Sequence, residues 1–126
     1  MIKFSFDNLV GIPSIKLSIL DNEEELGVYF LVPQADNIYE VHTHFHSHAY
    51  GSATDISKEA LKEAFNKIEN LDVLVTKVPV NNPLAKRLTK SVGMQFCGIL
   101  PKSYPTNTGL IDQEIYYITK EMVECQ

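Results

Sequence analysis

The order of elements predicted in the second half of the chain constrains the fold more than any other feature. Strand-like residues at about 38–47 lead into a turn of small residues at 51–53. From about residue 54 to residue 68, apolar side chains recur at helical spacing, with lysines and glutamates on the opposite side. A second strand is predicted at about 73–80. A strand, a helix and a further strand in this order predict a crossover that joins two parallel strands.

The residues before this crossover alternate between apolar and polar side chains. Strands are predicted at about 2–6, 14–19 and 26–33, separated by turn residues such as Asp21-Asn22. Short turns between consecutive strands are typical of antiparallel pairing. The first half of the chain is therefore expected to form an antiparallel meander, with the strand at 38–47 as its last member.

The residues after the crossover carry clear helix punctuation. Asn82 suits an N-cap, Pro83 suits the first helical position, and Gly93 suits a left-handed residue after the helix. A helix at 83–92, a strand at 94–100, a loop at 101–109 and a closing strand at 113–119 are predicted. The fold class expected is α+β, with a mixed, mostly antiparallel sheet and one parallel βαβ crossover.

Composition limits the range of functions. The 126 residues suit a single domain, 1–126, and an apolar fraction of 44% is that of a globular protein. The net charge is −5 and lysine and arginine are thinly spread, which argues against nucleic acid as a partner. No apolar run is long enough for a membrane span, and the start lacks a signal-peptide core. With only Cys97 and Cys125, the sequence predicts a cytoplasmic protein without a disulfide framework.

Two motifs resemble the signatures of the Gcn5-related N-acetyltransferases. One signature in that family has Arg or Gln, two residues, Gly, one residue, then Gly or Ala, and residues 48–53, His-Ala-Tyr-Gly-Ser-Ala, match its spacing with His in the first position. The other signature runs from Asn through Ala and Leu to Gly-Phe, and it is matched by Asn82, Ala85, Leu88 and Gly93-Met94. The resemblance covers about residues 14–120 and implies an acyl-CoA N-acyltransferase-like fold.

The resemblance implies acetyl-CoA as the acyl donor. A turn of small residues that enters a helix lets backbone N–H groups approach a pyrophosphate, and the helix N-terminus favours its negative charge. The residues expected to bind the donor are His48, Tyr50, Gly51, Ser52, Ala53 and Asn82.

The predicted fourth strand carries all four histidines of the chain. With a period of two residues, Glu40, His42 and His44 share one face, on which His46 and His48 also fall. Imidazole and carboxylate groups suit the removal of a proton from an amine, so Glu40, His42 and His44 are the candidate catalytic residues. Alternate histidines can also bind zinc, but no further ligand is clearly aimed at this face, and no metal is predicted.

Two departures from the family pattern affect the expected activity. Thr89 stands where members often have a tyrosine that acts as the acid, and Tyr104, Tyr116 and Tyr117 are the available substitutes. Family members also usually carry two helices between the first two strands, for which residues 7–13 are too few. The acceptor side should therefore be open, which favours a protein acceptor or a second subunit of a homodimer.

Two functions follow from these observations. The first is an acyl-CoA-dependent N-acyltransferase that transfers acetyl from acetyl-CoA to an amine. The second is a catalytically inactive module that keeps the fold for a structural or protein-binding role. Short acyltransferase-like chains with a Tyr-Glu-Val-His strand, here at residues 39–42, are also similar to proteins of tailed bacteriophages, and this favours the second function.

Overall fold

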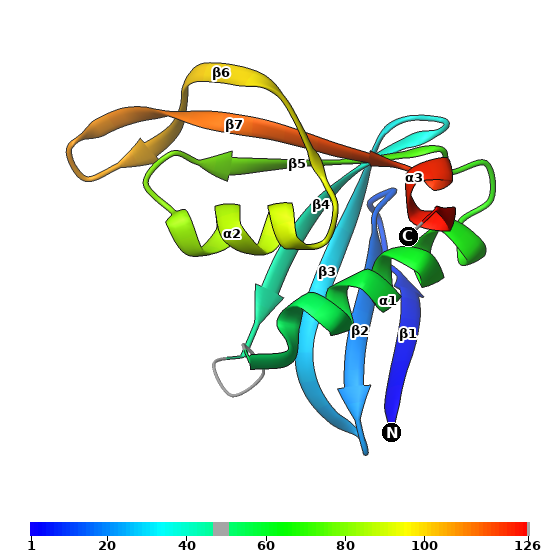
Figure 1. The fold of residues 1–126 in the computed structure, drawn as a ribbon. Coiled ribbons are helices and arrows are strands. Elements are labelled where there is room, and N and C mark those ends of the chain that lie inside the picture. The colour runs from blue at the N-terminus through cyan, green and yellow to red at the C-terminus, as the bar shows by residue number, and fades with distance from the viewer. Residues whose placement is uncertain (47–50, 126) are drawn as a thin grey trace.

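A computed structural model of the protein describes residues 1–46 and 51–125. In this part of the chain a single mixed sheet has the strand order β1-β2-β3-β4-β5-β7-β6 (Figure 1). The elements along the chain are β1 (Ile2–Asn8), β2 (Ile15–Asp21), β3 (Glu24–Ala35), β4 (Ile38–Phe45), α1 (Ala53–Lys67), β5 (Val73–Pro79), α2 (Pro83–Ser91), β6 (Gln95–Thr106), β7 (Gly109–Thr119) and α3 (Lys120–Glu124).

The sheet confirms the predicted α+β class. β4 and β5 are parallel and joined by α1, whereas the other neighbouring strands pair antiparallel. β1 and β2 pair from Ile2↔Asp21 to Asn8↔Ile15, so only a short turn connects them. The two helices that family members carry between these strands are absent from this segment, as the sequence predicted.

The C-terminal region differs from the prediction in two places. Residues 101–106, expected in a loop, continue β6 and form a long hairpin with β7, in which the Thr106 hydroxyl donates to the Gly109 carbonyl at 2.6 Å. The ladder is irregular between Leu100 and Tyr104, where Pro101 cannot donate a backbone hydrogen bond. The chain then ends in α3, whose N-cap Thr119 accepts a hydrogen bond from the Met122 N–H.

The helices α1 and α2 lie on one face of the sheet (Figure 1), and both line a cavity there. α1 buries its apolar stripe against that face, with Ala60, Leu61 and Phe65 nearly inaccessible to solvent. The sheet contributes Leu17, Leu31 and Ile118 to the same core. We call this side of the sheet the helix face. No helix in the described residues is long and apolar enough to cross a bilayer.

The opposite side of the sheet, which we call the open face, is more polar in its first four strands. Because alternate residues of a strand point to opposite sides, the register places Lys16 and Ser18 of β2 on this face, together with Glu40, His42 and His44 of β4. The three β4 residues predicted to share a face therefore do so.

Candidate active site

The sheet divides between β4 and β5. These strands pair over only three positions, from Ile38↔Val73 to Glu40↔Val75. Beyond that point β4 continues along β3, and β5 continues along β7, so the two strands run apart (Figure 1). The last contact is a hydrogen bond of 3.1 Å that the Thr76 hydroxyl donates to the Val41 carbonyl. We call the region beyond this bond the split.

Backbone groups of β4 face the split. The His46 N–H donates to the Leu26 carbonyl at 2.9 Å, so alternation along the strand turns the N–H groups of His42 and His44 toward β3. The N–H groups of Thr43 and Phe45 therefore point toward β5, where the described residues provide no ladder partner. A strand edge of this kind can donate hydrogen bonds to a bound molecule.

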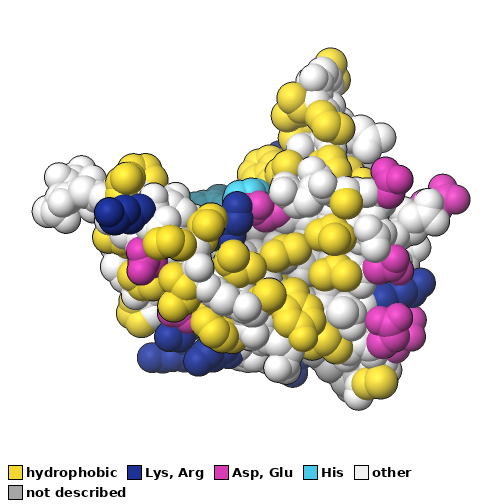
Figure 2. Space-filling view, turned by 90° about the horizontal axis from the view of Figure 1, so that it is seen from above, with side chains coloured by type: hydrophobic (Ala, Val, Ile, Leu, Met, Phe, Trp, Pro, Cys, Tyr) yellow, Lys and Arg dark blue, Asp and Glu magenta, His cyan; other side chains and the backbone are white. Residues whose placement is uncertain are grey.

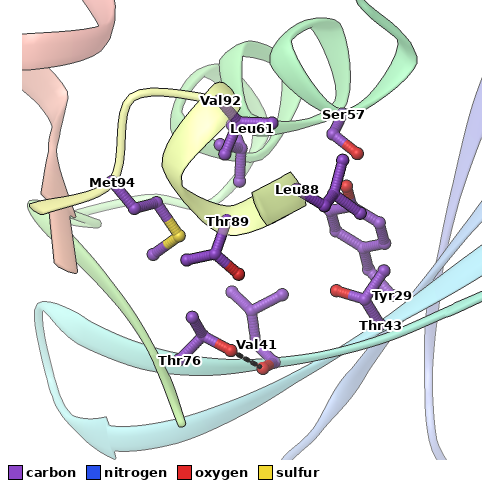
Figure 3. Close-up of a pocket in the computed structure, with 10 residues that line it drawn as sticks. All are labelled: Tyr29, Val41, Thr43, Ser57, Leu61, Thr76, Leu88, Thr89, Val92 and Met94. Carbon is purple, nitrogen blue, oxygen red and sulfur yellow. Dashed lines mark hydrogen bonds between the residues drawn. The ribbon is translucent and has the colours of Figure 1, made fainter. Parts of the chain in front are cut away.

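A cavity of about 40 Å³ opens on the helix face of the split (Figure 3). It is lined by residues of β3, β4, α1, β5 and α2 and of the segment after α2. The lining residues are Tyr29, Val41, Thr43, Ser57, Leu61, Thr76, Leu88, Thr89, Val92 and Met94. A volume of this size admits about three water-sized groups.

The polar end of the cavity lies between α1 and β3. Ser57 is buried, and its hydroxyl has no hydrogen-bond partner among the described residues. Figure 3 shows this hydroxyl pointing toward Tyr29. Burial raises the pKa of Tyr29 above its usual range, and the nearby Ser57 hydroxyl offsets only part of that increase. Tyr29, like any tyrosine near neutral pH, can donate a hydrogen bond.

The open face carries an ionic cluster at the head of the split. Glu40 is 8% exposed, and its carboxylate lies 3.1 Å from His42 Nε2 and 3.4 Å from Lys77 Nζ. The His42 side chain is 57% exposed, so it is accessible from solvent. Figure 2 shows histidine beside basic and acidic side chains in a hollow between two raised parts of the surface. The cluster can hold an imidazole in place while it exchanges a proton.

His44 does not join this cluster in the structure. Its ring contacts that of His46, with 5.5 Å between the centroids, and His46 lies 3.3 Å from a Glu25 carboxylate oxygen. The described residues bring no three His, Cys, Asp or Glu side chains together around a metal position.

The turn predicted to bind the donor is described in part. His48 and Tyr50 lie outside the described residues. Ser52 is the N-cap of α1, but its side chain makes no capping hydrogen bond, so the protein does not cover the first N–H groups of the helix through that side chain. A Cβ added to Gly51 would meet nothing within 4 Å, which leaves open space beside the turn. Ala53 is buried beneath it.

Asn82 has a local role at α2. Its side-chain oxygen accepts a hydrogen bond of 3.1 Å from the Ala85 N–H and so caps the helix. The C-terminal end of α2 lies beside the start of α1, because Ser91 Oγ and Thr54 Oγ1 are 2.9 Å apart. α2 is thus fixed at both ends near the split.

The possible acids occupy different environments. Thr89 lines the cavity, as a side chain at the position of the family's tyrosine would. Tyr116 is buried and donates to Glu114 at 2.7 Å, and burial together with this carboxylate raises the pKa of Tyr116 to about 12. Tyr104 is exposed on the β6–β7 hairpin. Tyr117 lies on β7 with its backbone paired to Val75.

Sequence reasoning missed three residues of the site. Lys77 reaches Glu40 because the parallel register places both on the open face, and that register could not be deduced from one strand alone. Tyr29 lies in an apolar run that resembled core, and Ser57 lies on the buried stripe of α1. A serine among apolar helix positions was the one available signal.

This arrangement defines a class of fold. A mixed sheet that opens between a parallel pair of strands, with the crossover helix starting at the open end, is the fold of the Gcn5-related N-acetyltransferases. The solved structures to which the chain is similar include spermidine N-acetyltransferases from Vibrio cholerae.

Two of these structures illustrate the extent of the similarity. Mutant forms of the spermidine/spermine N-acetyltransferase SpeG match with a TM-score of 0.80 at 20% identity, over 92% of this chain and 72% of theirs. The V. cholerae enzyme in complex with CoA and spermine matches with a TM-score of 0.78 at 21% identity, over 88% of this chain and 68% of its own. No protein-family model matches this chain, and no curated protein does.

Proposed function

We propose that the protein is an acyl-CoA-dependent N-acyltransferase that transfers an acyl group, acetyl in the simplest case, to an amine. The observation that carries this proposal is the split between β4 and β5. It is bordered by the N-terminus of α1, where the Ser52 side chain makes no capping hydrogen bond, by strand N–H groups that have no ladder partner among the described residues, and by a proton acceptor on the opposite face. One of the similar structures binds CoA and spermine, which supports a donor and an amine acceptor of this kind.

The residues present fit a CoA donor. The N-terminus of α1 offers backbone N–H groups and a partial positive charge to a diphosphate, and the open space beside Gly51 allows close approach. Ser52 and Ala53 belong to the same turn, and His48 and Tyr50, outside the described residues, are proposed as further donor contacts on the strength of the sequence motif alone. Asn82 fixes the start of α2 next to the split. The donor supplies a thioester whose carbonyl carbon accepts the nucleophile.

The open face suits the acceptor amine. A protonated amine cannot attack, so the site must remove a proton, and the neutral imidazole of His42 can accept it. The Glu40 carboxylate at 3.1 Å then stabilises the imidazolium, while Lys77 holds the other carboxylate oxygen. His44 is further along the same face and extends the polar surface over which an acceptor can bind.

The strand edge suits the carbonyl oxygen. As the amine nitrogen bonds to the carbonyl carbon, negative charge develops on the oxygen, and the Thr43 N–H faces the region where that charge forms. When the carbon–sulfur bond breaks, the sulfur carries the charge. The amine nitrogen carries one further proton, which it loses as the amide forms. Tyr29 has a raised pKa and Thr89 is an aliphatic alcohol, so neither is a strong acid, and we propose that water in the split relays this proton from the nitrogen to the departing sulfur, which leaves as the thiol of CoA.

The short connection between β1 and β2, described in full, contains no helix that could cover the acceptor side, which suits an amine on a protein or a contribution from a second subunit. Because the proposed donor is a metabolite of the cytoplasm, we place the protein there.

Titration with acetyl-CoA tests the proposal. A ligand that binds only the native state raises the melting temperature with concentration. We expect Gly51→Trp to abolish the shift by filling the open space beside the turn, and Gly51→Ala to retain it, since a Cβ meets no atom there. If the wild-type protein shows no shift at millimolar acetyl-CoA, the proposed function is wrong.

A second candidate function is a noncatalytic binding module, and one surface favours it. Large apolar side chains remain exposed near the β6–β7 hairpin and the start of α2, and Figure 2 shows a broad hydrophobic area on this side of the molecule. They are Val80, Leu84, Phe96, Ile99, Leu100, Tyr104 and Leu110. Exposed apolar patches of this kind mark contacts with other proteins. Absence of acetyl-CoA binding together with a stable homodimer in light scattering would favour this alternative, including an assembly role of the phage type.

A further inference from the structure

We infer that the acyl chain of the preferred donor is longer than acetyl, about four carbon atoms, and that its tail lies in the cavity beneath α2. The inference rests on the proposed function, because it concerns the same donor. Its starting point is the position of the cavity, which is lined by Val41 and Thr76, the two residues that make the last contact before the split.

The geometry of the reaction gives the direction of the acyl tail. The amine approaches from the open face, where Glu40 and His42 lie. The sulfur of the donor leads toward the N-terminus of α1, where the diphosphate binds. The carbonyl oxygen faces the N–H groups of β4 that have no ladder partner in the described part of the chain. The fourth direction at the carbonyl carbon leads to the helix face, and the cavity lies there.

The chemistry of the cavity wall matches a short aliphatic chain. Most of the wall surface is apolar and comes from Val41, Leu61, Leu88, Val92 and Met94, while Thr43, Thr76 and Thr89 contribute small side chains whose methyl groups can also contact an acyl chain. The polar end, with the buried Ser57 hydroxyl, lies at α1 and limits the apolar part. A cavity of about 40 Å³ admits two or three carbon atoms beyond the carbonyl, because a methylene group is comparable in size to water.

The sequence explains why this space exists. Thr89 projects into the cavity from α2, and a tyrosine at that position would occupy the space (Figure 3). α2 also contributes Leu88 to the cavity wall, and none of its residues is fully buried. The short Thr89 side chain leaves room that acetyl alone would not use.

Isothermal titration with CoA, acetyl-CoA, butyryl-CoA and hexanoyl-CoA tests the inference without knowledge of the acceptor. We expect butyryl-CoA to bind about tenfold more tightly than acetyl-CoA, since two more methylene groups are buried. Hexanoyl-CoA should gain nothing further, because its chain exceeds the cavity and meets the polar end at Ser57.

Variants of α2 test whether the cavity causes the preference for butyryl-CoA. Thr89→Tyr should bring the ratio of the butyryl-CoA and acetyl-CoA affinities close to one, and Thr89→Met, a more flexible filler, should do the same. Lys90→Tyr is the matched control, because it places the same side chain at the next, exposed position of the helix. The control should retain the wild-type ratio, and equal ratios in Thr89→Tyr and Lys90→Tyr would overturn the inference.

The ligand series separates this inference from the function on which it rests. If acetyl-CoA binds to the wild-type protein at least as tightly as butyryl-CoA, the inferred preference for a longer acyl chain is wrong, and the proposed acyl-CoA function is not contradicted. If neither thioester binds, and CoA does not bind either, both are wrong.

Discussion

Tyr116, Glu114 and Lys86 form a connection between the sheet and α2. Tyr116 donates to one Glu114 oxygen at 2.7 Å, and Lys86 Nζ lies 3.1 Å from the other. The Tyr116 hydrogen bond and the Lys86 hydrogen bond lower the pKa of Glu114, while burial and Glu114 raise the pKa of Tyr116 to about 12. These contacts join α2 to β7 and so help to fix α2 beside the split.

The Tyr116→Phe variant tests this connection through pH. A folded-state pKa of about 12, above the ordinary value of 10.0, means that Tyr116 stabilises the fold fully below pH 10 and loses that contribution as the pH rises toward 12. The free energy of unfolding, measured in urea between pH 8 and 11.5, should therefore fall more steeply in the wild-type protein than in Tyr116→Phe. Tyr104→Phe, at an exposed tyrosine, should follow the wild-type curve, and identical slopes in all three proteins would contradict the assignment.

At the scale of single residues, what the sequence could predict was set by local periodicity. The two-residue repeat of a strand placed Glu40 and His42 on one face, and the structure brings them to 3.1 Å. The same repeat could not show that Lys77 completes the cluster, because that contact depends on how far β5 is shifted along β4. Contacts between strands distant in sequence depend on register, which one sequence does not contain.

At the scale of elements, α2 depends on its caps because none of its residues is fully buried. Asn82→Ala removes the acceptor of the Ala85 N–H and should lower the free energy of unfolding by about 1 kcal/mol. Asn81→Ala is the control at an adjacent exposed position and should change it by less than about 0.5 kcal/mol. Urea unfolding gives both values, and equal values for the two variants would show that the cap is not needed.

Acetyl-CoA affinity of the same variants separates two roles of Asn82. If Asn82 affects donor binding only by positioning α2, then the acetyl-CoA affinity that Asn82→Ala loses should return when a second substitution restores the stability of α2. If its side chain contacts the donor, Asn82→Ala should weaken binding more than its effect on stability explains.

The element that was predicted correctly is specified by residues at its own ends, whereas the element that was predicted incorrectly depends on pairing with another strand. Asn82, Pro83 and Gly93 predict a helix at 83–92, and the structure has α2 at Pro83–Ser91, because these residues act within one turn of the helix ends. Residues 101–106 were predicted as a loop because proline and turn residues are frequent there, yet pairing with β7 keeps them in β6. Pairing with a partner strand outweighed local propensity in the hairpin.

At the scale of the whole molecule, the sheet consists of two parts joined at three residue pairs. Amide exchange should show this division, because the Thr43 and Phe45 N–H groups face the split while those of His42 and His44 face β3. We expect the first two amides to exchange much faster than the second two in the free protein, and to slow on addition of acetyl-CoA. The amides of the β5–β7 ladder provide the control, and uniform protection along β4 without ligand would contradict the split.

The presence of the helix face and the open face on opposite sides of the split has a consequence for engineering. Under the proposed function, the residues that would select the donor belong to α1, α2 and the cavity, and those that would select the acceptor lie on the outer surface of β1 to β4. The two specificities could therefore be altered separately. A library confined to Lys16, His44 and their neighbours is expected to redirect the proposed activity to new amines without a change of thioester.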